Sequence, residues 1–174
     1  MNLVITFSRR YGSGTSVIVQ NLVKEIRENT NLKCSVYDKS YFEGKDNVKN
    51  FDDEQNEIKK IVQESNKNDN EVLIFIGRAS AFALKDYPNA LHIYCYAAKE
   101  DRIERIMEKY NLSRQEAFLE INKKDKEREE YHFKYTNQIW GEVDTYQILL
   151  DTSKHGISNC GKLLFNYLEL HNYI

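Results

Sequence analysis

Residues 3–16 read LVITFSRRYGSGTS, and this stretch decides the fold. The apolar run Leu3–Phe7 is typical of a buried strand, and it passes through a Gly-Ser-Gly turn into the helical pattern Val17–Glu28. Gly12 and Gly14 let backbone N–H groups converge on an anion because no Cβ stands in the way, and the following helix presents its own free N–H groups to the same point. The stretch therefore predicts a strand, a phosphate-binding loop and a helix.

The loop matches the phosphate-loop pattern G-x-x-x-x-G-K-[ST] only in part. Gly14 and Ser16 keep the second glycine and the hydroxyl that faces Mg²⁺ in such loops, whereas Arg9 replaces the first glycine and Thr15 replaces the lysine. Arg9 and Arg10 are both candidates to supply the positive charge of that lysine. A tight turn without a ligand needs the same glycines, so the loop alone leaves both interpretations open.

Composition limits the classes of partner. The 174 residues carry 25 basic and 27 acidic side chains, and the net charge of −2 argues against broad electrostatic binding to nucleic acid or to an anionic membrane. Cys34, Cys95 and Cys160 show no paired spacing, which disfavours a disulfide framework or a zinc site and favours a reducing compartment. No run of about 18 apolar residues is present. We therefore expect one soluble, cytoplasmic domain over residues 1–174 that binds neither nucleic acid nor membrane.

Short apolar runs alternate along the chain with helical patterns such as Lys99–Tyr110 and Ile157–Leu170. Several of these runs are almost continuously apolar, as in parallel strands that helices cover on both faces. The pattern predicts a three-layer α/β fold with a five-stranded parallel sheet flanked by helices. The expected strands are Leu3–Phe7, Leu32–Tyr37, Val72–Ile76, Leu91–Ala97 and Tyr146–Leu150.

Two polar segments interrupt this alternation, Phe42–Asp69 and Ser113–Glu142. Ligands of open α/β sheets bind beyond the carboxyl ends of the strands, so insertions after the second and fourth strands flank the phosphate loop. We interpret them as a substrate flap (about 40–70) and a lid (about 113–142). A solvated linker helix explains the first segment equally well.

Three side chains are candidates for anion or metal chemistry. Arg128 lies in a basic stretch of the lid, where its fork of donors suits a transferring phosphoryl group, although a charged solvated helix has the same composition. Arg78 follows Gly77 at the end of the third strand, where it would clamp a second phosphate or else remain solvated. Asp38 ends the second strand, where it would orient Mg²⁺ or an attacking hydroxyl, or cap the next helix.

A set of motifs runs along nearly the whole chain: Ser8-Arg9-x-Tyr11-Gly12-Ser13-Gly14, Tyr37-Asp38-Lys39, Gly77-Arg78, Asp101-Arg102-x-x-Arg105-Ile106-Met107, Asp125-Lys126-x-Arg128-x-x-Tyr131, Tyr135-Thr136, Trp140-Gly141, and Tyr146 through Asp151-Thr152-Ser153 with Gly156. In this order the motifs together resemble the cytidylate kinase-like family of the P-loop nucleoside monophosphate kinase group. The resemblance is weakest between residues 42 and 70.

The resemblance implies a P-loop kinase fold and an enzyme that transfers the γ-phosphoryl group of ATP, with Mg²⁺, to a small phosphorylated acceptor, with CMP as the candidate. It places the triphosphate at Gly12, Ser13, Gly14, Thr15 and Ser16, with Ser16 on the metal. Arg78 and Asp38 then serve the acceptor, and Arg128 with Arg9 or Arg10 the transferring group; Arg102 and Arg105 lie near the lid hinge or on a charged helix face. The chain departs from the family pattern at Thr15, which lacks the lysine, and at Ala79, which replaces an acid.

Two other functions stay open. The missing lysine is also what a nucleotide-binding module without kinase activity would show. A structural or interaction protein would keep only the fold, with its aromatic-rich tail around Phe165, Tyr167 and Tyr173 packed in the core or forming a dimer contact. We expect a monomer or a homodimer.

Overall fold

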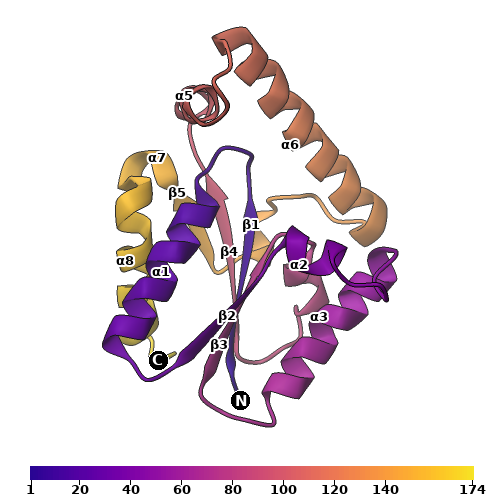
Figure 1. The fold of residues 1–174 in the computed structure, drawn as a ribbon, viewed down its shortest axis with the longest axis vertical. Coiled ribbons are helices and arrows are strands. Elements are labelled where there is room, and N and C mark those ends of the chain that lie inside the picture. Colours follow the sequence, from indigo (N-terminus) through magenta and orange to yellow (C-terminus); the bar gives the residue numbers. More distant parts are fainter.

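The computed structural model describes residues 1–174 and contains one sheet of five parallel strands in the order β2-β3-β1-β4-β5. The central strand β1 pairs with β3 on one side and with β4 on the other, and Figure 1 shows the sheet between the helices on its two faces. The predicted α/β fold is confirmed. The strands are β1 (Leu3–Arg9), β2 (Lys33–Tyr37), β3 (Glu71–Ile76), β4 (Ala90–Tyr96) and β5 (Ile148–Asp151).

Helices α1 (Thr15–Asn29) and α8 (Ile157–Leu170) cover one face of the sheet. Their apolar stripes and the inward side chains of the strands form a core of 20 buried residues, including Ile5 and Phe7 of β1. Glycine is required where the helices meet, because a Cβ on Gly161 would lie 2.5 Å from the Cβ of Asn21. Close packing of α8 on α1 closes this layer.

The other face carries α3 (Phe51–Ser65) and the short helices α2 (Lys39–Glu43) and α4 (Ser80–Ala83). A second core of eight buried residues lies between α3 and the strands, with Phe75 of β3 at its centre. The segment between β2 and β3 is therefore packed against the sheet through α3, although its sequence is strongly polar.

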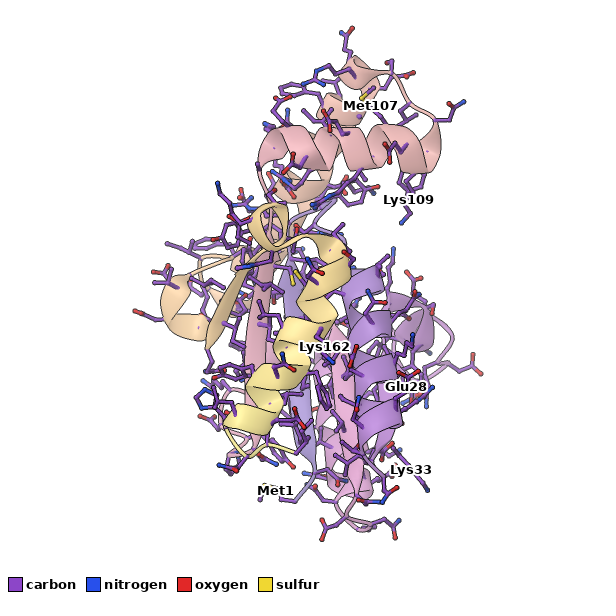
Figure 2. All side chains as sticks on the ribbon, turned by 90° about the vertical axis from the view of Figure 1, so that its left-hand side faces the viewer. Met1, Glu28, Lys33, Met107, Lys109 and Lys162 are labelled. Carbon is purple, nitrogen blue, oxygen red and sulfur yellow. The ribbon has the colours of Figure 1, made fainter.

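Helices α5 (Lys99–Tyr110) and α6 (Arg114–Thr136) form a hairpin beyond the carboxyl ends of the strands. Its small apolar core is separate from the two cores on the sheet. Figure 2 shows the hairpin from the side, with Met107 and Lys109 standing clear of Lys162 on α8. From its outer end α6 runs toward α2 and α3, so that its carboxyl-terminal half lies beside these two helices (Figure 1).

A short 3-10 turn (Val143–Thr145) and helix α7 (Thr152–His155) complete the fold on either side of β5. None of the helices combines the length and the apolar character that a membrane span requires.

Candidate functional site

A cavity of about 300 Å³ opens at the carboxyl ends of β1 and β3, between α2 and α6. The strands pass into loops at this edge of the sheet, so side chains from several elements meet in the cavity. Its walls come from the end of β1, from β3 and the turn after it, from α2, and from α6 and the loop that follows. The lining residues are Ser8, Arg9, Lys39, Ile76, Gly77, Arg78, Ala79, Lys124, Glu127, Arg128, Tyr131, His132 and Trp140.

The lining is strongly basic. It holds five cationic side chains and a single carboxylate, that of Glu127. Two of the cations have carboxylate partners on their own helices, since Lys39 lies 3.3 Å from Glu43 and Lys124 lies 3.6 Å from Glu127. The other three cationic side chains of the lining are Arg9, Arg78 and Arg128, and their partners decide the charge of the cavity.

Arg9, the last residue of β1, carries a partly buried guanidinium group that forms no ion pair, and the Asp38 carboxylate acts on its charge only from a longer distance. Burial and the nearby positive charge of Arg128 lower the pKa of Arg9 to about 10. The absence of a side chain at Gly77 makes room for this group, because a Cβ there would lie 2.9 Å from Arg9 Nη1. An unpaired buried cation is costly, and an anion in the cavity would offset that cost.

Arg128 reaches the same place from α6. Its Nη1 donates to the backbone carbonyl of Arg9 at 2.9 Å, its guanidinium lies 5.4 Å from the ring centre of Tyr11, and it forms no hydrogen bond with a carboxylate. Burial lowers its pKa. Two partly buried guanidinium groups that form no ion pair with a carboxylate therefore face one cavity, which is the arrangement that a doubly charged anion neutralises.

Arg78 reaches the cavity from the turn after β3 and is paired. Its Nε donates to Glu54 Oε2 at 2.7 Å, and Nη2 donates to the same oxygen. Burial opposes the charge of Arg78, but the hydrogen bond to Glu54 and the attraction of its carboxylate outweigh burial and raise the pKa. Glu54 belongs to the segment that the sequence left undecided between a flap and a linker, and nothing in its polar pattern distinguished this glutamate from its neighbours.

Arg10 and Asp38, the other two candidates, lie outside the cavity lining. Arg10 Nη1 is 2.8 Å from Glu129 Oε1, and its guanidinium packs 5.0 Å from the ring centre of Trp140. Asp38 caps α2 by accepting from Ser40 and from the Tyr41 amide, and the hydrogen bond from the Ser40 hydroxyl lowers its pKa. Between the two loop arginines, only Arg9 is free to meet an anion.

The glycine-rich loop adjoins the cavity at Arg9, but none of residues 12–16 lines it. Gly12 and Gly14 have φ of +81° and +79°, in the left-handed region that favours glycine. The first amides of α1, at Thr15 and Ser16, donate to no acceptor, as expected of an open helix amino terminus. Ser16 is exposed there, whereas Thr15 is buried, with the Cys95 thiol of β4 beside it.

Asp125 of α6 braces the loop, a role that sequence reasoning missed. Its Oδ1 accepts from the Tyr11 amide at 2.9 Å and its Oδ2 accepts from Arg102 Nη1 at 2.7 Å, while Arg102 also donates to the Tyr11 carbonyl at 3.1 Å. Arg105 donates to the Gly12 carbonyl and to Thr152. The two arginines of α5 thus fix the loop from behind. In the sequence, only the three-residue spacing of Arg102 and Arg105 and that of Asp125 and Arg128 pointed to these contacts.

The residues present fit a metal ion only as part of a nucleotide complex. No three His, Cys, Asp or Glu side chains gather closely enough to hold a metal ion by themselves. Ser16 offers one exposed hydroxyl beside the loop amides. Mg²⁺ that arrives with a nucleotide takes most of its ligands from phosphate oxygens and water, so one protein hydroxyl suits it.

Comparison with known proteins agrees with this architecture. The model of the cytidylate kinase-like family matches residues 25–154. An uncharacterized protein from Eubacterium ventriosum has a solved structure with a TM-score of 0.80, at 21% identity over 97% of this chain and 99% of the other. Shikimate kinase from Acinetobacter baumannii, solved in complex with shikimate, matches with a TM-score of 0.53 at 13% identity, over 99% of this chain and 95% of that one. No curated protein matches the sequence.

Proposed function

The chain belongs to the cytidylate kinase-like family, and on that premise we propose that it transfers the γ-phosphoryl group of ATP to a small acceptor that already carries a phosphate, with CMP as the first candidate. Residues 1–174 would act as one kinase domain, with α3 in the flap and α6 as the lid. The observation that carries the proposal is the pair of partly buried guanidinium groups of Arg9 and Arg128, which form no ion pair with a carboxylate and face one cavity.

In this reaction an oxygen of the acceptor phosphate attacks the γ-phosphorus, the bond from that phosphorus to the β,γ-bridging oxygen breaks, and ADP leaves with the bond's electron pair. The proton of a singly protonated acceptor phosphate passes to solvent. Such transfers depend on positioning and on charge stabilisation more than on covalent chemistry. The free amides at Thr15 and Ser16 would hold the triphosphate, with Ser16 on Mg²⁺, which supplies charge neutralisation when bound.

Each arginine then has a separate task. Arg78 would hold the acceptor phosphate from the flap side, and Arg128 would approach the transferring group from the lid. Arg9 would supply, from the end of β1, the positive charge that phosphate loops usually take from a lysine at the position of Thr15. In this arrangement the positive charge comes from the last residue of β1 and not from the first turn of α1.

One observation favours a second candidate, a nucleotide-binding module without transfer. Thr15 is buried, so no cation can extend from the first turn of α1 over the β- and γ-phosphates. If Arg9 does not reach those phosphates, the triphosphate would bind and remain intact.

Transfer of the terminal phosphoryl group from labelled ATP with Mg²⁺ to CMP, dCMP, UMP, AMP and GMP tests the proposal. Wild type is compared with Arg128→Met and with Arg114→Met, a matched arginine on the same helix that pairs with Glu100 on the surface. We expect turnover with one acceptor, a loss of at least about 100-fold in Arg128→Met by analogy with other charge-stabilising donors, and unchanged rates in Arg114→Met. Nucleotide binding without any turnover would support the binding module instead.

A further inference from the structure

The flap helix α3 buries two consecutive polar residues, Glu54 and Gln55, at 3% and 6% exposure. A buried carboxylate is unfavourable unless it is paired, and a buried amide is unfavourable unless it is hydrogen bonded. Both side chains find their partner in the same residue, Arg78, on the wall of the cavity. Because both side chains contact Arg78, this turn of α3 holds Arg78 in place.

The two contacts hold the side chain and the backbone of Arg78. The Glu54 carboxylate accepts from Nε at 2.7 Å and from Nη2, while Gln55 Nε2 donates to the Arg78 backbone carbonyl at 3.0 Å. The backbone needs this support, because Gly77, Arg78 and Ala79 have φ of 74°, 60° and 52° in succession. Left-handed conformations are unfavourable for residues with a Cβ, and they persist where the surroundings hold them.

The pairing also decides which edge of the guanidinium group faces the cavity. Glu54 occupies the edge formed by Nε and Nη2, so the Nη1 donors stay free for a ligand. Tyr131 of the lid helix packs on the other side, with its ring centre 5.8 Å from Arg78 Cζ and its hydroxyl 3.5 Å from Glu54 Oε1. Arg78 is therefore held between flap and lid with one set of donors exposed.

We infer that Glu54 is a positioning residue: it orients the Arg78 guanidinium so that its free donors meet the acceptor phosphate. The inference rests on the proposed function and deepens it, because it gives the polar segment between β2 and β3 a specific task. Glu54 is not among the residues that line the cavity. Its loss is expected to weaken acceptor binding selectively and to leave the triphosphate site unchanged.

The test compares Glu54→Gln with Glu57→Gln. Glu57 is a matched control, since it is equally buried on α3 and pairs with Lys45 at 3.1 Å, outside the cavity lining. The KM for CMP, or for the acceptor that the panel identifies, is measured together with the KM for ATP and with kcat. Direct binding of CMP is measured by calorimetry without ATP. We expect Glu54→Gln to raise the acceptor KM and Kd by about 10- to 100-fold, and to change the KM for ATP by less than about twofold.

Three results separate the possible failures. An active wild type whose acceptor KM is unchanged in Glu54→Gln overturns this inference and leaves the proposed function intact. Equal changes in both KM values, or equal effects of Glu57→Gln, would show that α3 has only a structural role. A wild type that neither binds nor phosphorylates any acceptor refutes the proposed function, and with it the role of Glu54.

A second variant covers the case in which Glu54→Gln does not fold. Gln55→Met keeps the length of the side chain but cannot donate to the Arg78 carbonyl. Because the Gln55 Oε1 atom is buried without a partner, this change also removes an unsatisfied acceptor, which offsets part of the stability lost with the hydrogen bond to the Arg78 carbonyl. We expect the acceptor KM to rise in the same direction, and an unchanged KM would contradict the inference.

Discussion

Replacing Arg9 by methionine should make the ligand-free protein more stable, although it removes a residue of the proposed site. The guanidinium is partly buried and forms no ion pair with a carboxylate, and it lies near a second partly buried cation, Arg128. Methionine keeps the length and flexibility of the arginine stem and removes the charge. The substitution therefore removes the cost of holding the Arg9 charge in the folded protein and keeps most of the packing of the side chain.

The magnitude follows from the pKa. A fall from 12.5 to about 10 means that the folded protein holds the charged form less well than the unfolded chain does. At about 1.4 kcal/mol for each pKa unit, the charged form costs about 3 kcal/mol. This cost is present at every pH below about 10 and vanishes only as the pH rises from there toward the unfolded value. Loss of the polar contacts of the arginine offsets part of the gain, so we expect a net stabilisation of about 1–2 kcal/mol, or about 2–8 °C in Tm.

Urea and thermal unfolding at pH 7.5 measure this difference, with and without inorganic pyrophosphate. The anion should stabilise wild type and have a much weaker effect on Arg9→Met. Arg10→Met is the control, because Arg10 pairs with Glu129 outside the cavity lining, and it should lose a little stability and keep the full response to pyrophosphate. An Arg9→Met variant that is less stable than wild type and still fully stabilised by pyrophosphate would refute the reasoning.

Three further changes probe the loop. Gly14→Ala combines a positive φ with a Cβ 2.3 Å from Ile157 Cδ1, so urea unfolding should show a loss of about 2–4 kcal/mol, and calorimetry a loss of ATP binding; wild-type stability would contradict the observed loop conformation. Asp125→Asn leaves the buried Arg102 without its carboxylate and should cost about 3 kcal/mol by urea unfolding, whereas a cost below 1 kcal/mol would show that the brace contributes little. Thr15→Lys restores the residue of the common loop pattern, but at a buried position, so we expect a Tm lower by several degrees and no gain in transfer rate; a faster enzyme would show that the lysine escapes to the phosphates.

The fold was predictable because its signals are local. Continuous apolar runs indicated parallel strands covered on both faces, and the observed sheet confirms this. The last strand was placed too early, at Tyr146–Leu150 instead of Ile148–Asp151. Tyr146 is buried, but it packs on the ring of Tyr94 at 5.1 Å in an aromatic cluster outside the ladder, and an apolar pattern cannot distinguish these two kinds of burial.

The polar insertions were harder to interpret, because charge patterns do not say which polar side chains are buried. Residues 113–142 contain one 23-residue helix, α6, of which only five residues are buried, and these include the polar Asp125 and His132. On the 51–65 helix, Glu54 looks no different in sequence from the acidic residues before it, yet it is buried against Arg78. Its partner is 24 residues away, and only the packing of α3 on the turn after β3 brings the two together.

The choice between Arg9 and Arg10 depends on a similar long-range effect. Both follow the same apolar run, so the sequence makes them equivalent candidates. Helix α6 separates them. Its Glu129 pairs with Arg10, while Arg128, one residue earlier, donates to the Arg9 carbonyl and leaves the Arg9 guanidinium without an ion-pair partner. Adjacent residues of α6 project about 100° apart, so Glu129 neutralises one loop arginine and Arg128 adds a second positive charge to the cavity. The unpaired charge of the site therefore depends on both β1 and α6, and any movement of α6 would change it.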